Sequence, residues 1–427
     1  MNRLILIGNG FDLAHGLKTS YKDFIFWYLD ECFKRAGIYA NSQPHEDEFL
    51  HISVLEHYRL TNLYNLSGQK GLSEYLYEQG LLEPYLSFDP DKQYGAKSNI
   101  EKYSKVSELT AHRVSFKSLF FKRLTDACLE CGWVDIEQEY FDALKKYNDG
   151  NKAHDLDYLR RINKDFEFLK SKLEEYLITE DGSGIEIHNK LLSALISDLK
   201  TDDFDTLLDK ESLIQGQLWD ITNELNNDKA YILNFNYTNT FKSYLDAIRE
   251  HKRYLSVEEN HIHGQLNNPD NSIIFGFGDE HDTAYTQFEE QRNNDLFAHI
   301  KSYFYMQTPN YRNLIRFLND GHFQVLVIGH SCGLSDRTMF KEVFDHENCK
   351  SVKIYHYTDD SGKNDFFDKT INLGRHFLAT KDVCGNSLWN LIRQMLFRKN
   401  EENRCIIRDC NREMHLRLSV KLYNTGC

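Results

Sequence analysis

The most informative stretch near the N-terminus is LILIGNGFD, residues 4–12. It begins as a short continuous apolar run, which is typical of a parallel strand buried on both faces. Gly8 and Gly10 follow at once, and such a turn lets the backbone approach a pyrophosphate at a helix N-terminus. The usual fingerprint has a further glycine where this chain has Leu13. The stretch therefore predicts either a nucleotide-binding α/β unit or a purely structural strand-to-helix turn.

Further apolar runs extend this first unit into an α/β fold. We expect one mostly parallel sheet, because short apolar runs alternate with helical stretches such as 288–305 and 334–344. Other short strand-like runs lie at 254–257 and 261–263. The principal strands of the sheet are expected to start at Arg3, Ala230, Ile273, Gln324 and Val352.

The long segment between the first strand and the rest of the sheet has a different pattern. Apolar and aromatic residues recur there at helical spacing among many Lys and Glu. We therefore predict a Rossmann-like, mostly parallel sheet with a large helical insertion after the first strand. The core comprises residues 1–20 and 228–398, the insertion comprises 21–227, and the tail 399–427 stays unassigned.

Composition limits where the protein acts. A net charge of −14 gives no general attraction for phosphate backbones or anionic membranes, so neither nucleic acid nor a membrane is an expected partner. No segment reaches the roughly 18 consecutive apolar residues of a membrane span, and the N-terminus has no leader pattern. We expect a cytoplasmic protein. Its nine cysteines include a single C-x-x-C, Cys128 to Cys131, so no metal is expected.

Several motifs follow the predicted strands and together resemble one protein family. GNGFDLAHGL (8–17), TSYKDF (19–24), WVDIE (133–137), NFNYT (234–238), HIHG (261–264) and GHSCGLSD (329–336) are similar to motifs of the bacteriophage abortive infection AbiH family. The resemblance implies a role in phage resistance, and a phage-derived activator is an expected partner. We also expect a homo-oligomer. Within WVDIE, Asp135 and Glu137 lie too close along a helix to share one face, so at most one faces a site.

The same strand ends are also similar to those of sirtuin-type NAD-binding domains. That likeness implies NAD as the bound nucleotide, with Asn236 and His263 beside the nicotinamide ribose. It implies a cofactor-binding set of Gly8, Asn9, Gly10, Phe11, Gly264, Gly329, Ser331 and Asp336. The paired zinc motifs of sirtuin deacylases are missing, so NAD cleavage is favoured over protein deacylation.

Asn236, His263 and Asp12 suit the cleavage of an N-glycosidic bond. The reaction builds positive charge on the ribose and needs a base and amides that orient water. Histidine titrates near neutrality, an asparagine amide both donates and accepts hydrogen bonds, and Asp12 would stabilise the charge. Each residue also has a structural alternative, because Asn236 and Asp12 could cap helices and His263 could make an internal bond. With Gly8, Gly10 and Ser331, we expect Asn236 and His263 to converge at the carboxyl ends of their strands.

Two other function classes remain open from the sequence. GHSCG fits the nucleophile elbow of a serine hydrolase, with Ser331 as the nucleophile and His263-Gly264 as oxyanion-loop residues. The catalytic triad also needs an acid and then a histidine base further along the chain, and Asp359 or Asp365 followed by His376 would supply them in that order. The second class is a non-catalytic, nucleotide-binding sensor of phage infection, which would use the helical block as its contact surface.

Overall fold

The structure of the chain is a computed structural model. It describes residues 1–37, 44–54, 112–131, 134–149, 156–181, 185–199, 228–358, 362 and 364–376. The chain divides into two compact units. The first comprises residues 1–18, 177–290 and 300–427, and the second comprises 19–176 and 291–299.

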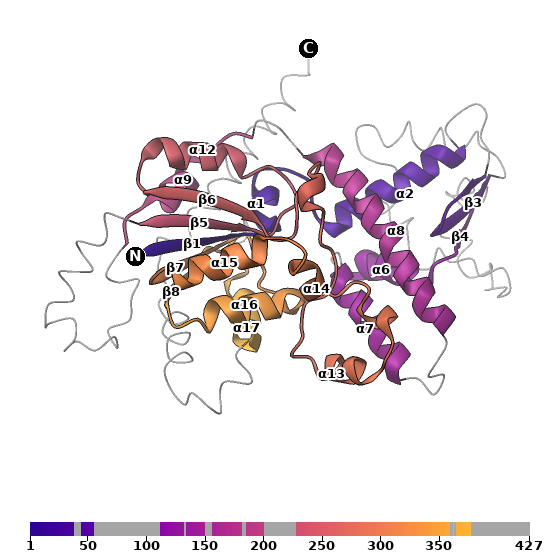
Figure 1. Cartoon of the computed structure of the whole chain (residues 1–427). Helices are drawn as coiled ribbons and strands as arrows, with labels where there is room; N and C mark the ends of the chain where they lie inside the picture. Colours follow the sequence, from indigo (N-terminus) through magenta and orange to yellow (C-terminus); the bar gives the residue numbers. More distant parts are fainter. Residues whose placement is uncertain are drawn as a thin grey trace, which may run out of the picture. The chain divides into compact units, whose positions relative to one another are not determined.

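The first unit contains a five-stranded parallel sheet in the order β6-β5-β1-β7-β8 (Figure 1). Its strands are β1 (Asn2–Ile7), β5 (Lys229–Asn234), β6 (Ser256–His261), β7 (Phe323–Ile328) and β8 (Cys349–Ile354). The chain builds the sheet outward from β1 to β6 and then crosses β1 to add β7 and β8. This order gives the sheet a switch point between β1 and β7, the place where open α/β sheets bind ligands. The predicted α/β class, with a parallel sheet and a helical segment after β1, is confirmed.

Helices cover both faces of this sheet, as the continuous apolar strands require. On one face, Ile5 and Ile7 pack with α9 (Asn189–Ile196) and α12 (Lys242–His251). On the other, Leu4 and Leu6 pack with α15 (Asn310–Asn319), α16 (Arg337–Phe344) and α17 (Phe366–His376). Alternate residues of β1 therefore serve separate cores, and the sheet holds its strand ends in fixed places.

Two strand predictions were wrong, for opposite reasons. Residues 273–275 are apolar and buried, but they form no strand. Ile274 N donates a hydrogen bond to His263 O at 2.7 Å, as in a sheet, but the pairing does not continue into a ladder. The runs predicted at 254–257 and 261–263 only overlap the two ends of a single strand, β6, which spans Ser256–His261 and continues through polar residues between them. The helix predicted at 288–305 is broken into the end of α13 (Thr283–Glu290), a 3₁₀ turn at Asn294–Phe297, and α14 (Lys301–Tyr305).

The second unit is mostly helical but also contains a small sheet. Its helices are α2 (Tyr21–Gly37), α6 (Leu119–Cys131), α7 (Ile136–Asp149) and α8 (Leu156–Glu180), of which α8 continues into the first unit. Its antiparallel strands are β2 (His45–Glu46), β3 (Leu50–Val54) and β4 (His112–Phe116). Phe49 stacks on Phe121 at 4.4 Å in its core. The predicted insertion 21–227 thus includes strands, and α9 within it belongs to the first unit. No helix in the described ranges is long and apolar enough to cross a membrane.

Candidate functional site

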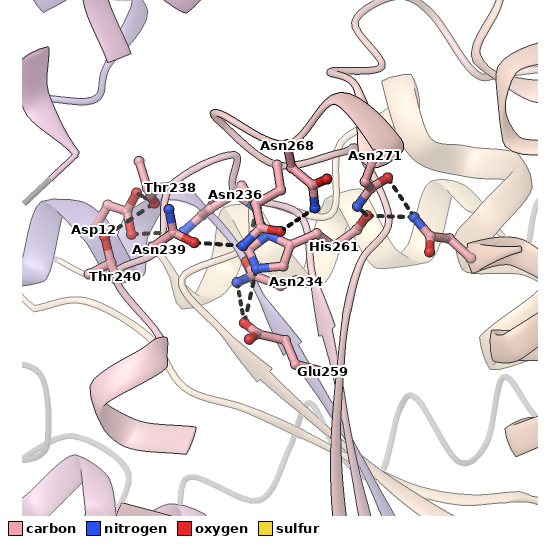
Figure 2. Close-up of polar contacts among 12 residues, drawn as sticks. Asp12, Asn234, Asn236, Thr238, Asn239, Thr240, Glu259, His261, Asn268 and Asn271 are labelled. Atoms are coloured by element: carbon pink, nitrogen blue, oxygen red, sulfur yellow. Dashed lines mark hydrogen bonds and ion pairs between the residues drawn. The ribbon is translucent and has the colours of Figure 1, made fainter. Parts of the chain in front are cut away.

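Buried polar side chains gather where β1, β5 and β6 end (Figure 2). They come from the glycine turn after β1, from the loop after β5 and from β6 itself. The hydrogen bonds continue outward through side-chain amides, with Gln265 donating to Asn239 at 2.6 Å and Asn268 donating to Gln265 at 2.9 Å. The carboxyl edge of the sheet is therefore lined by an ordered polar network.

Asp12 lies at the centre of this network. It follows the glycine turn on α1 (Asn9–Ala14) and is 1% exposed. Asn236 donates from Nδ2 to Asp12 Oδ1 at 2.9 Å, and the Thr238 hydroxyl donates to Oδ2 at 2.6 Å. Burial raises the pKa of Asp12 to about 6, although the hydrogen bonds from Thr238, Thr240 and Asn236 oppose the shift. A buried carboxyl that titrates near neutrality is typical of functional sites.

Asn236 is fixed in one orientation by two neighbours. Its amide nitrogen donates to Asp12 and also to the carbonyl oxygen of Gly8 at 3.2 Å. Both amide protons are thus used, and none of the residues the structure describes donates to its side-chain oxygen. Asn236 does not cap the next helix, because α12 begins at Lys242 with Phe241 as its cap residue. Its oxygen is therefore set to accept a hydrogen bond from a ligand.

A histidine that sequence reasoning missed supports this asparagine. His261 donates from Nδ1 to the carbonyl oxygen of Asn236 at 3.0 Å, and its Nε2 lies 3.3 Å from Glu259 Oε1. Burial alone would lower the pKa of His261, but the contact with Glu259 raises it overall. Burial alone would likewise raise the pKa of Glu259, yet its bonds with His261 and Asn234 lower it. The two residues form an ion pair. The sequence could have indicated it, because residues 259 and 261 are two apart along β6 and therefore lie on the same face of the strand.

The glycine turn packs against the end of β7 instead of standing open. Gly8 N donates to Ile328 O at 3.0 Å, and Gly10 N donates to Gly329 O at 2.7 Å. A Cβ on Gly8 would lie 2.6 Å from the Cα of His330, and one on Gly10 would lie 2.8 Å from Gly329 O. These glycines are required because the ends of β1 and β7 lie in close contact. This agrees with the interpretation of the stretch as a structural strand-to-helix turn.

Asn9 and Phe11, which flank Gly10, differ in burial. Asn9 is exposed, whereas Phe11 is 1% exposed and packs on Phe241 and Tyr244 in the core. The ring of Phe11 thus belongs to the core of the first unit, and its contact with a cofactor stays a prediction. Gly264 has a φ of +86°, and a Cβ there would lie 2.2 Å from Ser272 O. Its glycine is thus explained by a tight turn.

His263 belongs to a second buried cluster, which we call the Asp336 cluster and define as His263, Lys301, His330 and Asp336. Lys301 Nζ lies 2.8 Å from Asp336 Oδ1, and His263 Nε2 lies 3.0 Å from the same oxygen. His330 is more distant, at 3.8 Å from Asp336 Oδ2. The cluster lies directly beside the Asp12 network, since Phe235 contacts the His263 ring edge-on at 5.1 Å.

Burial lowers the pKa of both histidines in the Asp336 cluster. Burial, reinforced by the nearby Lys301 charge, lowers the pKa of His263. Burial also lowers the pKa of His330 to about 3. Burial opposes ionisation of Asp336, but the charge of Lys301 and the contact with His263 hold its pKa well below the usual value. His263 is buried, and its Nε2 lies 3.0 Å from both Asp336 Oδ1 and the Tyr305 hydroxyl, while the ring also bonds to the backbone of Phe235, so its polar contacts are with the protein.

The described residues do not assemble a serine-hydrolase triad. Ser331 is exposed, and within the described ranges no histidine bonds to its hydroxyl. His376 is buried and bonds from Nε2 to the carbonyl oxygen of Cys332 at 2.9 Å. Asp365 accepts from the backbone of Tyr357 and pairs with Lys369. Asp359 lies outside the described residues.

The remaining sequence candidates lie in the second unit. Trp133 is outside the described residues. Asp135 caps α7, accepting from Gln138 N at 3.1 Å, and Glu137 is buried. Cys128 is a buried, free thiol on α6.

Comparison with known proteins gives one match. A family model for bacteriophage abortive infection AbiH matches residues 4–357 of the chain, which confirms the resemblance noted from the motifs. No curated protein and no solved structure matches the chain. The likeness to sirtuin-type domains stays a prediction.

Proposed function

Because this chain belongs to the bacteriophage abortive infection AbiH family, and is thus an anti-phage protein, we propose that it acts by binding and hydrolysing NAD⁺. The proposed site is the carboxyl edge of β1, β5 and β6. One observation carries the proposal: Asp12, a buried carboxyl, clamps the amide of Asn236 so that the amide oxygen is left to a ligand. Support also comes from the sheet order, because this edge lies next to the switch point, where open α/β sheets bind ligands.

In the proposed reaction, water replaces nicotinamide at the ribose carbon. The N-glycosidic bond breaks with its electron pair leaving on nicotinamide, a bond forms to the water oxygen, and the water proton is released to solvent. Asn236 accepts a hydrogen bond from the attacking water or a ribose hydroxyl through its side-chain oxygen. Asp12 is mostly ionised at neutral pH, because its pKa is about 6. Its negative charge favours the positive charge that develops on the ribose.

This proposal changes the role expected of His263. A base must reach the water or substrate from which it takes a proton, and the His263 ring is buried and bonded to Asp336, Tyr305 and the backbone of Phe235. We assign His263 instead to positioning: it anchors Phe235, and hence the loop that carries Asn236, to the Asp336 cluster. Its substitution would then act through the placement of Asn236.

The test is direct. Purified protein is incubated with NAD⁺, with and without an extract of phage-infected cells, and nicotinamide release is followed beside a generic ester substrate. Release of nicotinamide with no ester cleavage is the expected result. Binding of NAD⁺ without release under either condition would favour the sensor, and ester cleavage without nicotinamide release would favour the hydrolase.

A further inference from the structure

Three side chains with metal-binding atoms converge in the second unit. Cys32 lies on α2, His45 lies on β2, and Asp47 lies in the turn between β2 and β3. The thiol sulfur, a ring nitrogen and a carboxylate oxygen all lie within 4.8 Å of one another. Cys32 and His45 are buried, and Asp47 is partly buried. In the part of the chain that the structure describes, this is the only such group of three.

The carboxylate of Asp47 is held so that one oxygen faces the other two residues. Its Oδ1 accepts from the backbone nitrogens of Phe49 and Leu50, both at 2.9 Å. Its Oδ2 lies 3.0 Å from His45 Nε2, 3.9 Å from Cys32 Sγ and 2.6 Å from the hydroxyl of Tyr28. The main chain thus fixes the position of Oδ2, as outer hydrogen bonds do for metal-ligating carboxylates.

The separations are close to those of a tetrahedral ligand set. Zinc bonds to sulfur, nitrogen and oxygen place neighbouring ligand atoms about 3.3–3.6 Å apart. The observed 3.0 Å and 3.9 Å lie on either side of that range, within about half an ångström. A thiol is a weak hydrogen-bond donor, so its contact with Asp47 does not account for its position, whereas a thiolate is a strong ligand for zinc.

We infer that Cys32, His45 and Asp47 bind a divalent transition-metal ion, and that zinc is the ion they fit best. Mixed sulfur, nitrogen and oxygen donors favour zinc over magnesium or calcium, which prefer oxygen alone. On binding, the Cys32 thiol releases its proton to solvent, and His45 binds through Nε2 as a neutral ring that carries its proton on Nδ1. Three protein ligands leave a fourth position for water, and the Tyr28 hydroxyl donates to Oδ2 of Asp47, the oxygen that would bind the metal.

This site runs against the expectation, drawn from the single C-x-x-C, that the protein holds no metal. Its ligands come from a helix, a strand and a turn, so no short spacing motif marks them in the sequence. An ion there would tie α2 to the β2-β3 turn within the second unit.

The full-length protein tests this inference by two measurements. Zinc is added, unbound metal is dialysed away, and the zinc per chain is determined; cobalt then replaces zinc for absorption spectroscopy. We expect one zinc per chain and a thiolate-to-cobalt charge-transfer band. Cys32→Ala and His45→Ala should lower zinc affinity by at least about 100-fold, since loss of an outer partner alone costs about 10- to 100-fold. Cys128→Ala, which removes an equally buried thiol elsewhere in the unit, should leave zinc binding unchanged.

Equal zinc binding by the wild type and Cys32→Ala would overturn the inference, as would failure of the wild type to retain zinc. If Cys32→Ala does not fold, the cobalt spectrum of the wild-type protein decides. A spectrum without the thiolate band would then show that Cys32 is not a ligand. Neither readout depends on NAD⁺.

Discussion

Asp12→Asn changes the pH dependence of stability by an amount that follows from the burial of Asp12. The pKa of this carboxyl rises from 3.8 in the unfolded chain to about 6 in the folded protein. Each pKa unit corresponds to about 1.4 kcal/mol, so the ionised form costs the folded protein about 3 kcal/mol relative to the protonated form.

The direction in which stability changes with pH follows from how many protons Asp12 binds in the folded and the unfolded protein. Between pH 3.8 and about 6 the folded protein binds more protons at Asp12 than the unfolded chain does. The free energy of unfolding therefore falls as pH rises through this window, and the loss is complete above about pH 6. Asparagine has the same shape, and its amide can still accept from Asn236 and bond with Thr238, but it carries no charge. The variant lacks this component of the pH dependence.

Urea unfolding from pH 4 to pH 8 measures the effect. The free energy of unfolding of Asp12→Asn minus that of the wild type should increase by about 2–3 kcal/mol between pH 4 and pH 7. Taking the difference removes the contribution of all other titrating groups. A difference in unfolding free energy that stays constant over this pH range would refute the conclusion that burial raises the pKa of Asp12.

Three further outcomes test the packing and charges around the site. Gly329→Ala should destabilise the protein by more than about 2 kcal/mol in urea unfolding, because the position has a φ of +70° and no room for a Cβ; Gly333→Ala, with its nearest atoms at 3.6 and 3.9 Å, is the matched control. Lys301→Ala should cost about 3–5 kcal/mol by the same measurement, since it leaves Asp336 buried without its main partner; a cost below about 1 kcal/mol would contradict the buried pair. Ser331→Ala should lower the rate of nicotinamide release only mildly, whereas abolished turnover would restore the nucleophile interpretation.

The sequence predicted the interior of the sheet better than its edge. β1, β5 and β7 are buried on both faces and stand out as continuous apolar runs. β6 is an edge strand whose polar residues, such as Glu258, hide its continuity. Residues 273–275 show the reverse case, because burial in a loop gives the same apolar run as a strand.

The candidate site was predictable as a location but not as a set of contacts. Asn236 and Asp12 were both identified, because polar residues directly after strands meet at one edge of a parallel sheet. The choice of His263 over His261 depended on partners that only tertiary packing supplies. Lys301 and Asp336, far along the chain, occupy the neighbourhood of His263. The turn glycines were likewise ambiguous, since close packing and phosphate binding both require a missing Cβ.

The rate of nicotinamide release from NAD⁺ by Asn236→Ala, set against that of the wild type, tests the central proposal most directly. Asn260→Ala is the matched control, because it removes a buried asparagine whose side chain bonds to Tyr231 and to the backbone of Asn310, and neither of these bonds is to Asp12, Asn236 or His261. We expect the wild type and Asn260→Ala to release nicotinamide and Asn236→Ala to lose at least about 100-fold in rate, on the order of one positioned catalytic group. Equal rates for wild type and Asn236→Ala, or no release by the wild type with or without the extract of phage-infected cells, would contradict NAD⁺ hydrolysis at this site.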